Sequence, residues 1–351
     1  MMKVPWSRRL GVILPALGFL LLVSGIISIT IGAVGVSPWT VFSLLIYKVP
    51  VIGNQLVTPW WSETIETIIW NLRVPRTLLA AFTGMSLAVA GAAFQGLLRN
   101  PLAEPYTVGV SSGAALGAAL VIILGLGSGF FGLLLLPIAA FTGAFATILG
   151  VYRIAALNGR FDTETLILAG VALSSFLTAI LSFLMTLAQD SLKQLIYWLM
   201  GSFATGGWDH VLAILPYLII GFTLIWMNYR ELNILTLGEE SAGQLGINVE
   251  RTKLILLFSA TLMAGGAVAL AGTVGFVGLV VPHVVRLLLG PDHRVLIPAA
   301  ALTGGIFLVV ADTVARTVMA PVELPVGVIT AFLGAPFFAY LLRKHRRSRR
   351  I

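Results

Sequence analysis

Long apolar runs separated by short polar segments make up most of the chain. A helix needs about 20 apolar residues to cross the hydrocarbon core of a bilayer, and ten runs are read as such spans. They lie near residues 10–34, 74–98, 105–126, 130–152, 164–188, 211–229, 253–272, 274–290, 295–319 and 325–342. These runs are continuous, whereas the strands of an outer-membrane barrel alternate in polarity. The pattern predicts an all-α polytopic membrane protein in which residues 1–351 form a single transmembrane domain.

Composition and charge support this topology. The chain is 58% hydrophobic and 10% charged, whereas soluble domains carry about 25% charged residues. With a cytoplasmic start, 17 of the 22 Lys and Arg residues fall inside, and the other five are Lys48, Arg73, Arg76, Lys193 and Arg316. This distribution follows the positive-inside rule and predicts that both termini are cytoplasmic. The basic tail at 343–350 directly follows a span, so anionic lipid explains it without nucleic acid.

An insertion at residues 231–253 interrupts the later spans. Its charged residues surround short apolar faces on either side of Gly238 and Gly243, as two small helices joined by a flexible corner would give. Helices of this kind are too short and too charged to cross a bilayer, and we expect them to pack against another surface. We predict that a separate protein pushes on the chain here, and the alternative is an ordinary solvated loop.

Two further segments are predicted to lie at the outer surface. Residues 36–72 carry four tryptophans, a residue type enriched at membrane interfaces. Residues 189–210 are predicted to form a short interfacial helix that ends at Gly206 and Gly207. Neither segment has the spacing of an active site.

Small residues and helix breaks characterise the spans. Glycine-rich runs such as Gly84–Gly96 and Met263–Gly278 permit close helix packing. The sequence also breaks at NPLAEP (Asn100–Pro105) and at GFVGLVVPH (Gly275–His283). Irregular backbone at membrane depth is tolerated only beside protein or a water-filled cavity, so the breaks indicate a pathway.

The two halves of the chain also share a pattern. Residues 76–98 and 251–280 each have a basic start, a Gly/Ala-rich middle and an aromatic-Gly-Leu ending. In the predicted topology they run in opposite directions. This arrangement predicts two inverted five-helix halves, which are common in transporters.

Several motifs together identify a family resemblance. They are NPLAEPYTVGVSSGA (residues 100–114), LTLGEESAGQLGI (235–247), GFVGLVVPHVVR (275–286) and ELPVGVITAFLGAPFF (323–338). In this order and spacing they resemble the FecCD-type permeases, the transmembrane subunits of ABC importers for iron-siderophores, haem and cobalamin. The resemblance covers about residue 70 to the C-terminus. It implies a type II ABC importer permease fold.

The resemblance also implies partners. A second permease subunit, most simply an identical chain, would pair with this one, two ATP-binding subunits would dock on the cytoplasmic side, and a substrate-binding protein would dock outside. The chain lacks the GxxxxGK[ST] phosphate-binding loop, so ATP and Mg²⁺ are expected on the partner ATPase. The permease itself is expected to be no enzyme and to hold no cofactor. The expected location is the bacterial cytoplasmic membrane.

By the same resemblance, the insertion contains the coupling helices that contact the ATPase. The residues expected at this contact are Leu237, Gly238, Glu239, Glu240, Ala242, Gly243, Leu245 and Gly246. Glu239 and Glu240 are expected to pair with basic residues of the ATPase cleft. The apolar residues and glycines are expected to allow close packing.

The resemblance places binding-protein docking at Arg73, Arg76 and Arg316. Arginine suits this role because its planar guanidinium holds a carboxylate bidentately. Interfacial snorkelling is the alternative for Arg73 and Arg76. For Arg316 the alternative is an i,i+4 pair with Asp312.

The gate is expected at Asn100 and Leu102, with Asp162 and Thr163 close by. A plain helix cap explains Asp162 and Thr163 equally well. Gln95 is a polar group within a span, so it is either part of the pathway wall or a hydrogen-bonding link between helices.

Metal ligation by the chain itself is not expected, because His210, His283, His293 and His345 are scattered. The sequence thus predicts the permease of an ABC importer. Ferric siderophore is the first expectation for its cargo, haem the second and cobalamin the third. The main alternative is an ion-coupled secondary transporter, which needs ionisable groups near the midplane.

Overall fold

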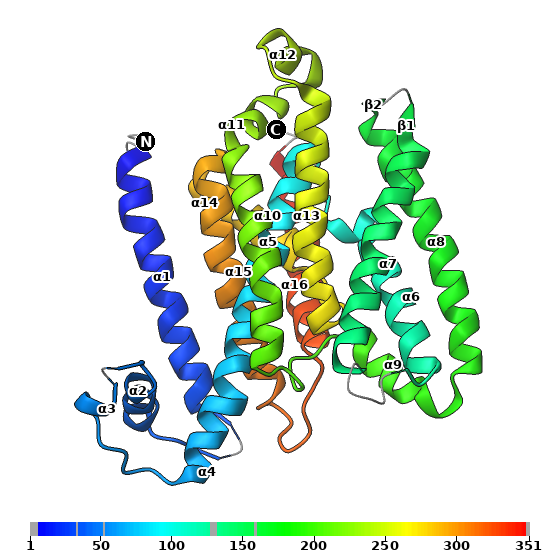
Figure 1. Cartoon of the computed structure of the whole chain (residues 1–351). Coiled ribbons are helices and arrows are strands. Elements are labelled where there is room, and N and C mark those ends of the chain that lie inside the picture. The colour runs from blue at the N-terminus through cyan, green and yellow to red at the C-terminus, as the bar shows by residue number, and fades with distance from the viewer. Residues whose placement is uncertain (1–5, 33, 52, 127–131, 158–159, 349–351) are drawn as a thin grey trace.

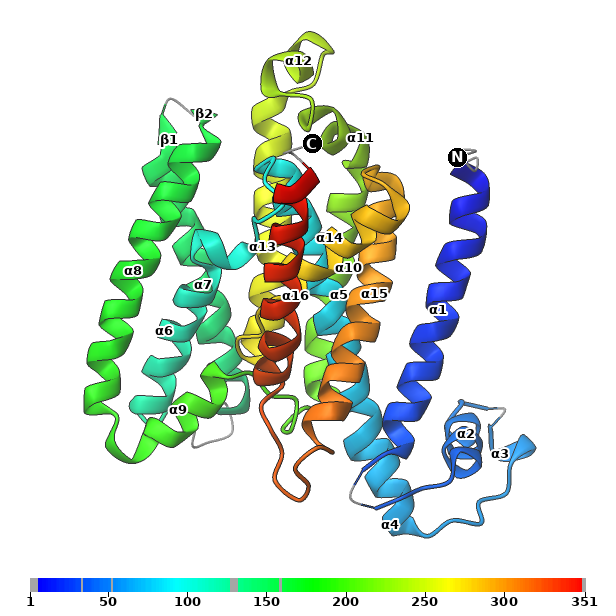
Figure 2. The ribbon, with the colours of Figure 1, turned by 180° about the vertical axis from the view of Figure 1, so that it is seen from behind.

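Helices make up nearly all of the computed structural model, which describes residues 6–32, 34–51, 53–126, 132–157 and 160–348. Ten of the helices in these residues correspond in order to the ten predicted spans, and the longer ones run between the two ends of the molecule (Figures 1 and 2). These ten helices are α1 (Trp6–Thr30), α5 (Val74–Leu97), α6 (Val110–Ile123), α7 (Gly132–Ala155), α8 (Thr163–Leu187), α10 (Trp208–Met227), α13 (Val249–Ala271), α14 (Val277–Leu289), α15 (His293–Ala315) and α16 (Val326–Ser348). The predicted all-α polytopic fold is confirmed.

Two of the ten helices are shorter than predicted. Seven helical stretches of the described residues are long and apolar enough to cross a membrane by length and composition, and the shorter apolar stretches include α6, α14 and the part of α16 at Val326–Tyr340. The helices α6 and α14 have 14 and 13 residues, which corresponds to about 21 and 20 Å at 1.5 Å per residue. The spans predicted near 105–126 and 274–290 therefore contain helices, but these begin five and three residues later than predicted. The first run begins as the 3₁₀ turn η2 (Pro105–Val108), and Gly109 at φ +92° separates that turn from α6.

The two halves repeat one arrangement in opposite directions. A long central helix, an irregular linker and a short helix follow each other as α5, residues 98–109 and α6, and again as α13, residues 272–276 and α14. The helices α5 and α13 pack together and point in opposite directions (Figure 1). This agrees with the two inverted halves predicted from the sequence.

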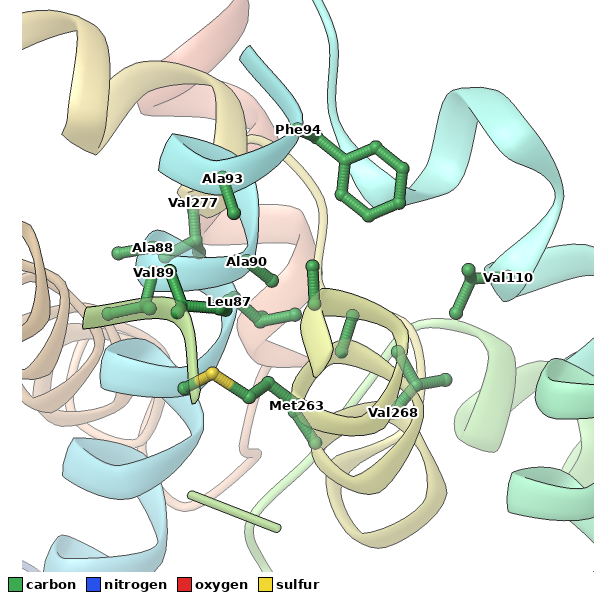
Figure 3. Close-up of a cluster of buried hydrophobic side chains, with 14 of the residues drawn as sticks. Leu87, Ala88, Val89, Ala90, Ala93, Phe94, Val110, Met263, Val268 and Val277 are labelled. Atoms are coloured by element: carbon green, nitrogen blue, oxygen red, sulfur yellow. The ribbon is translucent and has the colours of Figure 1, made fainter. Parts of the chain in front are cut away.

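The centre of the fold is α5, which is buried along almost its whole length. Leu87, Ala90 and Phe94 lie among Met263 and Val268 of α13, with neighbouring helices on the other sides (Figure 3). Glycines bring backbones together here. A Cβ atom added to Gly91 would lie 2.6 Å from the Cα of Gly278 on α14, and one added to Gly84 would lie 2.6 Å from the carbonyl carbon of Gly304 on α15.

One end of the molecule carries short helices between the spans. These are α2 (Pro38–Tyr47), α3 (Gly53–Leu56), α4 (Glu63–Glu66), the π-helical segment η1 (Thr67–Arg73), the 3₁₀ turn η3 (Gln189–Ser191) and α9 (Leu192–Leu199). The prediction that the second interfacial helix ends at Gly206 and Gly207 is wrong. It ends at Leu199 with Met200 as its C-cap, and Gly201 adopts φ +70° directly afterwards.

The opposite end carries the insertion between α10 and α13. It consists of α11 (Tyr229–Leu235) and α12 (Glu239–Gln244), which confirms the two small helices predicted there. A hairpin of β1 (Ala156–Leu157) and β2 (Arg160–Phe161), which the sequence did not predict, joins α7 to α8 at the same end. The start of α1 and the end of α16 also lie at this end (Figures 1 and 2).

Candidate functional site

The tip formed by α11 and α12 projects beyond the spans (Figure 1). Gly238 turns the chain between the two helices at φ +120°. After α12, Gly246 at φ +83° donates to the Gly243 carbonyl (3.0 Å), and the N–H of Ile247 donates to the Ala242 carbonyl (3.1 Å). This is a Schellman cap, in which a left-handed residue ends the helix, so glycine at position 246 is required by the backbone.

The tip exposes two leucines beside the polar side chains of Glu240, Ser241 and Gln244. Leu237 and Leu245 are 69% and 64% exposed, whereas Ala242 is fully buried. A Cβ atom added to Gly243 would meet no atom within 4 Å. The tip therefore presents two leucines and an open glycine away from the rest of the chain. Single exposed leucines are common on proteins, but here both occur within nine consecutive residues of one projection.

Asn233 fixes α11 to the spans. Its amide donates to Oδ1 of Asp292 (2.8 Å), and its Oδ1 accepts from the backbone N–H of His293 (2.9 Å) at the start of α15. Leu232, on the same helix, is fully buried and lies beside Gly96 near the end of α5. These contacts hold α11 to the start of α15 and to the end of α5.

The two glutamates of α12 have different surroundings. Oε2 of Glu239 accepts from Nζ of Lys253 (3.1 Å) within the chain, whereas Glu240 is exposed. The expected pairing with a partner's basic residues therefore suits Glu240, because the carboxylate of Glu239 already has a partner.

The linker after α5 contains the predicted gate residues. Oδ1 of Asn100 accepts from the N–H of Leu102 (2.9 Å), which closes a tight turn, and Leu102 is 41% exposed. Asp162 caps α8, because its Oδ2 accepts from the N–H groups of Glu164 (3.1 Å) and Thr165 (3.2 Å). The cap that we considered for Asp162 is thus present, and a gating role stays a prediction.

A tyrosine connects the two helix breaks. Oη of Tyr106, in the first linker, donates to the carbonyl of Val274 in the second (2.9 Å) and accepts from the N–H of Val274 (3.2 Å). Phe276 adopts φ +68° at the end of the second linker and lies against Gly334 of α16. Irregular backbone from both halves therefore meets at one point, where both backbone polar groups of Val274 are hydrogen-bonded to Tyr106.

Gln95 acts as a link between helices. Its Nε2 donates to the carbonyls of Gly278 and Leu279 on α14 (3.2 Å each), and its Oε1 accepts from Arg286 (2.7 Å). The side chain is 3% exposed. The hydrogen-bonding alternative accounts for the whole amide, so nothing in its surroundings supports a place in the pathway wall.

The predicted docking arginines lie together at the opposite end, and each donates hydrogen bonds within the chain. Arg73, 7% exposed, donates to the carbonyls of Ile29 (2.8 Å), Thr30 (3.3 Å) and Val34 (2.5 Å). It thereby satisfies carbonyls at the end of α1, where a helix leaves them free.

Arg316, 9% exposed, also binds α1. It donates to the carbonyl and to Oγ (2.7 Å) of Ser28, and its Nε lies 3.8 Å from Oδ2 of Asp312. The i,i+4 pair with Asp312 is thus present.

Arg76 lies between two carboxylates. Its Nε and Nη2 hold Asp312 with distances of 2.8–3.2 Å, and its Nη1 lies 2.9 Å from Oε2 of Glu323. Asp312 is 2% exposed at its side chain, whereas Glu323 is 43% exposed. Of the three predicted arginines, Arg76 is therefore the one with an accessible and exchangeable partner.

Sequence reasoning did not single out Tyr106, Asn233 or Lys253. Asn233 and Lys253 lie in the insertion. Each is a polar residue next to leucine, and this pattern could have indicated a side chain that is buried and hydrogen-bonded. Tyr106 directly follows NPLAEP, the break already selected. Among the residues that the structure describes, no three His, Asp or Glu side chains gather at a point where a metal ion could bind.

Comparisons with known proteins agree with these features. The model of the FecCD transport family matches residues 20–344. The uncharacterized ABC transporter permease YvrB of Bacillus subtilis is 48% identical, with 80% of each chain covered. The cobalamin import system permease BtuC of Halobacterium salinarum is 43% identical, covering 97% of this chain and 96% of the relative.

One solved structure covers nearly the whole chain. It is the inward-facing conformation of a transporter assigned to the metal-chelate ABC type. The sequence identity is 31%, the TM-score is 0.79, and the match covers 95% of this chain and 99% of the other. The solved fold therefore extends over both halves and the tip.

Proposed function

The chain belongs to the FecCD transport family, and from this premise we propose that it is the permease of an ABC importer that carries a metal chelate inward. In this proposal two ATP-binding subunits supply the energy by hydrolysing ATP with Mg²⁺. A substrate-binding protein delivers the cargo from outside, and a second, identical permease chain completes the pathway. The expected location is a bacterial cytoplasmic membrane, with both termini cytoplasmic.

The observation that carries the proposal is the α11–α12 tip. It exposes Leu237 and Leu245, and it is bonded through Asn233 to the start of α15. An apolar projection held rigidly to the spans is suited to receive force from a protein outside the membrane. Contacts with buried apolar anchors at their centre supply most of the energy of a protein interface. We therefore assign the residues from Leu237 to Gly246 to ATPase contact.

The outer docking point in this proposal is Arg76. Glu323 is partly exposed and holds Nη1 of Arg76 by a charge-assisted pair, so a carboxylate of the binding protein can take its place without breaking the buried pair with Asp312. Arg73 and Arg316 hold α1 beside this point. Their proposed part in docking is to position α1 and to keep the local charge positive.

The cargo is proposed as a ferric siderophore, with haem and cobalamin as the next candidates. The relative from Halobacterium salinarum is named for cobalamin import, and the similar solved structure is assigned to the metal-chelate type. Both names point to large metal chelates rather than to free ions. In the proposed pathway Asn100 and Leu102 lie at the inner gate, with the start of α8 beside them.

The deciding experiment is uptake into proteoliposomes that contain the permease with its co-purified ATPase. The binding protein is loaded in turn with a ferric siderophore, haemin or cyanocobalamin. We expect accumulation of one cargo only when both ATP and Mg²⁺ are present. Accumulation driven by an ion gradient in liposomes without the ATPase would refute the proposal in favour of a secondary transporter.

A further inference from the structure

Lys253 lies at the junction of three cytoplasmic-end elements. It belongs to the second turn of α13, and it is only 1% exposed although it carries a charge. Lysine is almost never fully buried without partners. Its surroundings therefore explain why the residue is there.

The ammonium group has a partner for each of its three donors. Nζ donates to the carbonyl of Phe161, to Oε2 of Glu239 (3.1 Å) and to Oε1 of Glu250 (3.3 Å). It also lies 4.3 Å from the centre of the Phe161 ring, which is within the range of a cation–π contact. An ammonium has three N–H donors, so no further protein or water contact is needed.

These partners lie on different elements. Glu239 is the first residue of α12 in the tip, and Glu250 and Lys253 belong to α13. Phe161 ends the β1–β2 hairpin and directly precedes Asp162, the cap of α8. Lys253 is the one described residue that is hydrogen-bonded to both α12 and the residue before the α8 cap.

The helix on the far side of this junction leads to the helix breaks. Gly170 of α8 packs directly against Val108 in the linker between α5 and α6, because a Cβ atom at Gly170 would lie 2.7 Å from the Cα of Val108. A movement of α8 would therefore displace the linker that carries Tyr106. A second route from the tip runs through Asn233 to α15 and does not involve Lys253.

We propose that Lys253 is a positioning residue that transmits displacement of α12 to the start of α8. This inference rests on the proposed function, in which an ATPase moves the tip. Removing the ammonium separates α12 from Phe161, so the tip then drives α15 but no longer drives α8. A lysine that served only to stabilise the fold would affect both routes alike.

The chain has no cysteine, so single cysteines can be labelled without a background. Exposed positions are available on each element: Gln244 on α12, Glu164 on α8 and Arg294 on α15. Each is replaced by cysteine, labelled with bimane, and reconstituted with the ATPase. The emission is recorded before and after addition of ATP with vanadate.

In the chain that is otherwise unaltered, we expect the bimane emission of all three labels to change when ATP and vanadate are added. With Lys253→Met the labels at Gln244 and Arg294 keep their response, whereas the response at Glu164 falls at least fivefold. Cargo transported per ATP falls about tenfold. Lys253→Arg, which restores a donor group, returns at least half of the Glu164 response, and Arg251→Gln, a charge removed from an exposed neighbour, changes nothing.

An undiminished response at Glu164 in Lys253→Met refutes the inference and leaves the proposed function intact. No response at Gln244 in the unaltered chain refutes the proposed function itself. If Lys253→Met does not fold, Lys253→Gln is used, because it also removes the ammonium and lies outside the assigned ATPase contact. It is expected to lower the Glu164 response at least twofold, and an unchanged response refutes the inference.

Discussion

The close contact between α5 and α14 predicts that Gly91→Ala destabilises the protein. The added Cβ would lie 2.6 Å from the Cα of Gly278, whereas carbon atoms pack at about 3.5–4.0 Å. The two backbones must therefore separate by about 1 Å. One turn further along, Gln95 donates to the carbonyls of Gly278 and Leu279 at 3.2 Å, and the same separation breaks these hydrogen bonds.

The expected loss follows from these two effects. Overpacking a tight contact costs about 1–3 kcal/mol, and each lost hydrogen bond costs about 1 kcal/mol. The higher helix propensity of alanine relative to glycine stabilises the folded state by about 1 kcal/mol and offsets part of this loss. We therefore expect Gly91→Ala to lower the free energy of unfolding by about 2–4 kcal/mol.

The measurement is unfolding in mixed micelles with increasing SDS, followed by circular dichroism. Gly18→Ala in α1 is the matched control, because its Cβ would meet nothing within 4 Å. The control is expected to unfold at the same SDS fraction as the unaltered chain or a higher one. If Gly91→Ala unfolds together with Gly18→Ala, the backbone contact between α5 and α14 is not tight and the reasoning is refuted.

Three further predictions concern the two ends of the molecule. Replacing Leu237 and Leu245 together with Asn is expected to weaken ATPase binding at least tenfold with unchanged thermal stability, and pull-down with purified ATPase measures this; retained binding contradicts the tip assignment. Glu323→Gln is expected to strengthen binding-protein affinity about threefold to tenfold at low salt and less at high salt, as measured by surface plasmon resonance, with exposed Glu63→Gln as an inert control. Arg76→Met leaves the buried carboxylate of Asp312 with only the 3.8 Å contact to Nε of Arg316, so it is expected to cost about 3 kcal/mol in SDS unfolding and to abolish docking; wild-type affinity would argue against this docking point.

Hydropathy predicted the number and order of the spans because burial in lipid requires apolar residues whatever their contacts. It overestimated the helices at 105–126 and 274–290, because apolar composition does not report backbone conformation. The conformations of Gly109 and Phe276, both at positive φ, depend on the neighbours they pack against. The breaks themselves were predicted, because proline and glycine signal them locally.

The side-chain partners were not predictable for a different reason. Gln95 was recognised as polar within a span, but its acceptor on Gly278 lies 183 residues away. Lys253 counted only as one more cytoplasmic charge, and Glu239 was expected to point outward. Their mutual contact depends on how the hairpin, α12 and α13 meet in space, which one sequence does not reveal.

The two hydrogen bonds between Tyr106 and Val274 bear on whether small ions could leak through the protein. One tyrosine hydroxyl joins the irregular segments of both inverted halves, with one hydrogen bond donated and one accepted. Neither segment can rearrange by itself without leaving buried polar groups unsatisfied, which is costly in a membrane. If the protein works as the proposed importer, this contact disfavours a state in which only one half has changed conformation and small ions can leak through.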